Sequence, residues 1–221
     1  MINLFNVFTL LRMLPVSTFV QANLGMETFI FLSVFIMTHR CFQIMDSKNG
    51  NVLNVCDIFR LLVRKFYRLA VPYYLMWVIM WCVTSRAGDG PIWSNTNVTY
   101  GTCKDDWLYT LLFVGNLFPN EMEPYAGCFQ QAFALQLDMQ IALFVPFLAI
   151  IAYKVPFVAI LLSLGLIFAN AVVTIYYVDK YDLKAGFMAV ENFNLLTGII
   201  GKPWTKLQNI GQGIIFALIY R

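Results

Sequence analysis

One apolar run, residues 129–154, constrains the fold more than any other part of the chain. It is long enough to cross a bilayer as a helix, yet it carries Gln131, Gln136, Asp138 and Gln140 in its first half. A carboxylate in hydrocarbon costs about 3 kcal/mol unless it faces a protein interior or a wet cavity. Because Gln136 and Gln140 lie one turn apart on one helix face, the pattern favours a polar cavity around Asp138 over a single buried contact between helices.

The composition places the whole chain in a membrane. Of its 221 residues 60% are hydrophobic and 12% are charged, which is outside the range of ordinary soluble domains. The net charge of +3 is spread over loops, so nucleic-acid binding is not expected. One histidine and scattered cysteines supply no ligand set for a metal, and no bound cofactor is expected.

We therefore predict an all-α fold, a polytopic transmembrane helix bundle forming one membrane domain over residues 24–221. Five spans are expected, at residues 24–45, 61–84, 129–153, 157–178 and 207–220. The segment 107–118 is too short to cross and is expected on or within the outer leaflet. Residues 1–23 form an N-terminal segment that we interpret as an interfacial helix. A signal peptide is not favoured, because no charged region precedes the apolar residues of this segment and Arg12 interrupts them.

The distribution of charge predicts the orientation of these spans. The loop 40–68 is expected to be cytosolic because it is rich in basic residues, namely Arg40, Lys48, Arg60, Arg64, Lys65 and Arg68. The loop 85–128 then lies on the extracellular or lumenal side. It holds a glycosylation sequon at Asn97 and two cysteines, which suit an oxidising compartment. We predict a Cys103–Cys128 disulfide that closes the outer loop 85–130, worth about 3 kcal/mol by chain entropy.

Five sequence blocks, taken together and in order, resemble the acyltransferase-3 family, in its animal branch similar to the nose-resistant-to-fluoxetine proteins. The first reads GMETFIFLS at residues 25–33, where the family has a segment like SVDTFFFLSG. The others are KFYRL with PYY at 65–74, a cysteine, tryptophan and asparagine pattern at 103–116, a cysteine followed by LQLDMQ within 128–146, and KPWTK with a later glycine at 202–213.

The resemblance implies an enzyme that transfers an acyl group from acyl-CoA, its co-substrate, to a hydroxyl acceptor. By this resemblance and their residue chemistry, the candidate catalytic carboxylates are Asp138 and Glu27, the latter standing where the family has Asp. The donor phosphates would meet Arg64, Lys65 and Arg68, although the orientation rule explains these basic residues equally well. The expected polar cavity includes Gln136, Gln140, Asn116, Lys202 and Trp204.

The chain departs from the family in its histidine. The family's proton-handling histidine precedes the first block, whereas residues 1–23 contain no histidine. His39 is the only one, and a straight helix would separate it from Glu27 by about 18 Å, too far for a catalytic pair. Three explanations of the missing histidine are open. The chain is an incomplete copy that another chain completes, a truncated sequence, or a degenerate member of the family that is kept for structure.

About half of the family's fold is present, so we expect a partner membrane subunit or a missing half in addition to the lipid bilayer. A half bundle would leave polar groups such as Asp138 short of internal partners. Two interpretations therefore compete: an acyltransferase-like membrane protein that is inactive alone, and a non-catalytic structural subunit of a membrane protein complex. A transporter is less favoured, because no inverted repeat is visible.

Overall fold

The structure, a computed structural model, describes residues 22–82, 103–117, 129, 132–180 and 201–221. Within these residues every regular element is a helix, as predicted. The elements are α3 (Ala22–Ser47), α4 (Val55–Cys82), α6 (Cys103–Leu111), α7 (Phe133–Lys154), α8 (Pro156–Lys180), the short 3₁₀ helix η5 (Pro203–Thr205) and α10 (Leu207–Tyr220).

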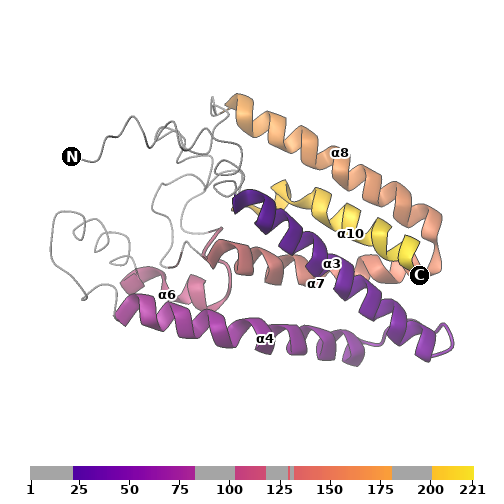
Figure 1. The fold of residues 1–221 in the computed structure, drawn as a ribbon, viewed down its shortest axis with the longest axis horizontal. Coiled ribbons are helices and arrows are strands. Elements are labelled where there is room, and N and C mark those ends of the chain that lie inside the picture. The colour runs from indigo at the N-terminus through magenta and orange to yellow at the C-terminus, as the bar shows by residue number, and fades with distance from the viewer. Residues whose placement is uncertain (1–21, 83–102, 118–128, 130–131, 181–200) are drawn as a thin grey trace.

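Four of these helices form a bundle, and α4 lies at its edge. Helix α10 packs between α3 and α8, while α7 packs against both α3 and α8 (Figure 1). Helix α4 contacts α7 and diverges from α3 beyond the turn that joins them, with α6 beside its far end (Figure 1).

The bundle core is built from apolar residues at helical spacing. Ile30 and Val34 of α3 are buried against Leu137 and Ile141 of α7 and Ile214 of α10. Alanines on the facing surfaces allow close approach of the helices; they are Ala142, Ala149, Ala152, Ala159 and Ala217. A second cluster joins α4 to the segment after α6, where the rings of Tyr73 and Phe113 stack with centroids 4.4 Å apart.

Three of the described helices are long and apolar enough to cross a membrane: Gly25–Ser47, Phe133–Lys154 and Pro156–Lys180. They are consistent with an integral membrane protein. Helix α4 is not among the three, and its first half carries Asp57, Arg60, Arg64, Lys65 and Arg68. Helix α10 is apolar but short. The prediction of five spans therefore stays a prediction for these two helices.

Some sequence predictions differ from the described helix boundaries or lie outside the described residues. Helix α7 begins at Phe133 rather than 129, and Phe129 instead packs as a separate buried ring 5.5 Å from that of Tyr73. Residues 1–21, Gln131, Asn97 and Cys128 lie outside the described residues, as does the side chain of Cys103. The disulfide, the glycan and the interfacial helix stay predictions.

The turn from α3 to α4 is held by contacts from the C-terminal end of α7. Asn49 and Gly50 adopt positive φ angles of 56° and 81°, and the Gly50 amide donates to the Met45 carbonyl at 2.9 Å, which ends α3. The Lys154 ammonium at the end of α7 donates to the Gly50 carbonyl, and the Tyr153 hydroxyl donates to Asp46 at 2.8 Å. These contacts set where α4 starts relative to α3.

Candidate functional site

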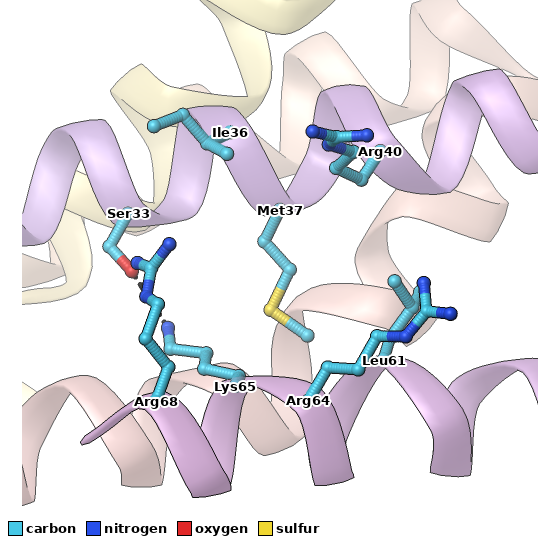
Figure 2. A pocket seen from close by; sticks show the side chains of 8 residues that line it. All are labelled: Ser33, Ile36, Met37, Arg40, Leu61, Arg64, Lys65 and Arg68. Carbon is cyan, nitrogen blue, oxygen red and sulfur yellow. Dashed lines mark hydrogen bonds between the residues drawn. The ribbon is translucent and has the colours of Figure 1, made fainter.

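A cavity of about 330 Å³ lies between α3 and α4, and we call it the cationic cleft. Its lining residues recur at helical spacing on each helix, so one face of α3 meets one face of α4. They are Ser33, Ile36, Met37 and Arg40 from α3, with Leu61, Arg64, Lys65 and Arg68 from α4. Figure 2 shows Ser33 and Met37 pointing toward α4, and Lys65 and Arg68 rising toward Ser33.

The deep end of the cationic cleft is closed by an ion pair. The Lys65 ammonium donates to the Ser33 hydroxyl at 2.7 Å and to the Asp138 carboxylate of α7 at 2.7 Å. Asp138 is 1% exposed, so the carboxylate is sheltered by protein. It lies behind Lys65 and is not itself among the lining residues of the cleft.

The position of the Lys65–Asp138 ion pair bears on whether the orientation rule alone explains the basic residue Lys65. From Ser47 to Ser33, α3 rises about 21 Å, which is more than half of the roughly 30 Å hydrocarbon thickness of a bilayer. Basic residues that only set orientation lie in loops and near helix ends. Lys65 lies within α4 and is held by Ser33 of α3 and Asp138 of α7, so a role in orientation alone does not explain its position.

Three arginines of the cationic cleft have no counter-charge within the described ranges. Arg40, Arg64 and Arg68 are exposed, and no carboxylate among the described residues pairs with any of them. Asp138 offsets only Lys65. Like charges around one cavity repel one another, so an anion in the cationic cleft would relieve that repulsion.

The residues predicted to line a polar cavity, Gln136, Gln140, Asn116, Lys202 and Trp204, lie in two groups linked by hydrogen bonds and a ring contact, one of which also contains Tyr73. The Gln136 amide donates to the Tyr73 hydroxyl at 2.9 Å, and that hydroxyl donates to the Thr110 carbonyl. The Gln140 amide donates to Asn116 at 2.6 Å, and the Lys202 ammonium donates to the Asn116 carbonyl at 2.8 Å. Lys202 also lies over the Trp204 ring, 5.8 Å from its centroid.

The second candidate catalytic carboxylate lies in a different cluster. Glu27 of α3 forms an ion pair with Lys206 and accepts a hydrogen bond from the Asn209 amide. Both partners come from the segment that starts α10. His39 exchanges a 3.0 Å hydrogen bond with Gln43 one turn away. The described contacts thus hold Asp138, Glu27 and His39 in three separate groups.

A second cavity, of about 260 Å³, adjoins the cationic cleft toward the α3–α4 turn, and we call it the turn cavity. It is lined by Ile44, Ser47, Lys48, Asp57, Arg60, Leu61 and Arg64. Lys48 pairs with Asp57, and this hydrogen bond, together with one from the Asn54 amide, lowers the pKa of the Asp57 carboxyl. Asp57 is therefore charged at neutral pH.

Three of the four basic residues in the cationic cleft were predicted from the sequence as phosphate-binding residues, whereas Arg40 and Ser33 were not. Arg40 served only to orient the chain, and Ser33 was only part of a motif. The signal that could have found them is spacing, since 33, 36, 37 and 40 share one face of α3. Which neighbour that face would meet was not visible in the sequence.

The chain was compared with protein-family models, curated proteins and solved structures. No protein-family model matches this chain, and neither a curated protein nor a solved structure matches it.

Proposed function

We propose that this chain is a membrane-bound acyltransferase-like protein whose cationic cleft binds the phosphate groups of an acyl-CoA donor. The observation that carries the proposal is the set of three arginines that no carboxylate of the described residues pairs with, around a cavity of about 330 Å³. That volume is at the lower end of ordinary ligand pockets, enough for part of such a donor.

The chemistry of the lining residues suits a phosphate on an amphiphile. Guanidinium groups bind phosphate through two parallel hydrogen bonds, and Arg40, Arg64 and Arg68 approach the cavity from two helices. Ile36, Met37 and Leu61 supply an apolar part of the same wall. Ile36 is 49% exposed, so apolar surface continues from the cleft to the outside of the bundle, where an acyl chain could lie.

The role proposed for Asp138 is to position Lys65. Acyl transfer to a hydroxyl needs a base for the proton and donors for the developing oxyanion. The Asp138 carboxylate accepts from an ammonium and is buried behind it, which fits a group that orients a cation at the deep end of the cleft. Glu27 is likewise occupied by Lys206 and Asn209.

The occupied carboxylates support a second candidate, a non-catalytic structural subunit of a membrane protein complex. In this alternative the ion pairs hold helices together, and the transfer chemistry has been lost or belongs to a partner chain. Among the described residues, no histidine contacts a carboxylate, which favours this candidate over independent catalysis.

The test is binding of palmitoyl-CoA to the purified protein in nanodiscs of zwitterionic lipid. The double variant Arg64→Gln/Arg68→Gln should weaken binding at least tenfold, because each lost charged hydrogen bond is worth about 1.5–3 kcal/mol. Lys180→Gln, at the far end of α8, is the matched control and should bind as the unmodified protein does. Unchanged affinity in the double variant would overturn the proposal.

The same preparation separates the two candidates. With labelled palmitoyl-CoA, the chain alone is expected to bind the donor without hydrolysing or transferring the acyl group. Turnover that Asp138→Asn abolishes, without loss of donor binding, would instead establish catalysis and remove the structural candidate.

A further inference from the structure

The cationic cleft and the turn cavity share part of one wall. Leu61 and Arg64 line both, so the two spaces meet at these residues along the same side of α4. From Arg68 to Arg60 this side of α4 rises about 12 Å. Cationic side chains therefore extend beyond the volume of a single pocket.

The turn cavity is positively charged despite its carboxylate. Lys48, Arg60 and Arg64 contribute three positive charges, and Asp57 contributes one negative charge. Asp57 is engaged by Lys48, whereas no carboxylate among the described residues makes an ion pair with Arg60. An anion at Arg60 and Arg64 would meet two guanidiniums with Asp57 at one side.

A single bound phosphate would leave the positive charges at one end of the two cavities without a counter-charge. Arg68 and Lys65 lie at the deep end and Arg60 and Lys48 at the turn, with Arg64 between them. A ligand with two anionic groups set on the order of 10 Å apart would complement both ends.

Resting on the proposed function, we infer that the turn cavity is a second phosphate subsite, which reads a phosphate separate from the one bound in the cationic cleft. For a coenzyme A donor, the second group is the phosphate on the ribose 3′ position, and the diphosphate occupies the cationic cleft. Arg60 is then a specificity-determining residue, because it contacts the group that distinguishes coenzyme A from dephospho-coenzyme A.

The experiment compares coenzyme A with dephospho-coenzyme A, which lacks only the 3′-phosphate. Both lack an acyl chain, so partition into the membrane does not contribute to binding. In nanodiscs of zwitterionic lipid, the unmodified protein should bind coenzyme A about tenfold more tightly. Arg60→Gln should remove that preference by weakening coenzyme A alone, and Lys180→Gln, at the far end of α8 and outside both cavities, should retain it.

A second variant tests the same subsite without removing a cation. Asp57→Asn deletes the negative charge beside the proposed phosphate while keeping an oxygen acceptor, so it should strengthen binding of coenzyme A several-fold and leave dephospho-coenzyme A unchanged. Equal affinity of the unmodified protein for both ligands would overturn the second subsite, and the proposed function would stand. If the protein binds neither coenzyme A, nor dephospho-coenzyme A, nor palmitoyl-CoA, both the second subsite and the proposed function would be overturned.

Discussion

Asp138 illustrates how a buried carboxylate can be kept in a helix long and apolar enough to cross a membrane. Its charge is offset by Lys65 at 2.7 Å, and Lys65 has a further acceptor in Ser33. The ionic partner of Asp138 belongs to the same chain, and the partner membrane subunit stays a prediction. A buried pair of this kind contributes little net stability compared with apolar residues, yet it is damaging to break.

Lys65→Met is expected to destabilise the protein by about 3 kcal/mol, because it leaves the Asp138 charge buried without a partner. The double variant Lys65→Met/Asp138→Leu should recover most of that loss. Thermal unfolding in detergent, followed by tryptophan fluorescence, measures both. Lys48→Met, which breaks the more exposed pair with Asp57, is the control and should change the midpoint little. A double variant as unstable as Lys65→Met alone would contradict the ion-pair interpretation.

At the level of helices, α10 depends on two glycines that allow its neighbours to come close. A Cβ added at Gly211 would lie 2.5 Å from the Ser163 carbonyl oxygen of α8, and one added at Gly213 would lie 2.7 Å from Val34 of α3. Neither the backbone of α8 nor the buried branched side chain of Val34 can yield easily. These two contacts fix α10 between α3 and α8 and place Lys206 and Asn209 beside Glu27.

Gly211→Ala should therefore lower the unfolding free energy by about 1–3 kcal/mol, since the added methyl group forces α10 away from α8. Gly165→Ala on α8 is the matched control, because no atom lies within 4 Å of its added Cβ. That variant should be neutral or stabilising, as alanine favours the helix. Thermal unfolding of both proteins in the same detergent gives the comparison, and equal effects would show that the close approach is unimportant.

For the molecule as a whole, the basic residues and the helix ends near the α3–α4 turn gather at one end of the bundle. Lys154 contacts Gly50, and Arg221 pairs with Asp46 at 3.2 Å while stacking on the Tyr153 ring. This clustering fits the predicted cytosolic orientation of loop 40–68. Exposed apolar side chains cover the outer face of α8, among them Phe157, Leu161, Phe168 and Ile175, as expected for contact with lipid or a partner subunit.

The predicted orientation can be checked with the chain's own cysteines and sequon. Cys56 is exposed at the start of α4, so a membrane-impermeant maleimide should label it only after cells are permeabilised, as read by peptide mass spectrometry. Cys41 is buried and should stay unlabelled in both conditions. Endoglycosidase should shift the gel mobility of the unmodified protein but not of Asn97→Gln. Labelling of Cys56 in intact cells would reverse the orientation.

The candidate site was partly predictable for a local reason. Arg64, Lys65 and Arg68 stand at helical spacing in one stretch, so their shared face on α4 follows from the period of the helix. Arg40 lies far from them in the sequence, and only the packing of α3 and α4 against α7 brings it to the same cavity. The pairing of Glu27 with Lys206 was equally out of reach, because it depends on where α10 packs.

By itself the sequence determined that the chain forms membrane-type helices, because long apolar runs can satisfy their backbone groups in lipid only as helices. It also identified Asp138 as a charge that needs shelter. How the helices pack determined that Lys65 shelters it and that three arginines between α3 and α4 pair with no carboxylate in the part of the chain that the structure describes. The physical reason is that contacts between residues far apart in sequence follow from how helices dock, which close approaches such as Gly211 against Ser163 determine.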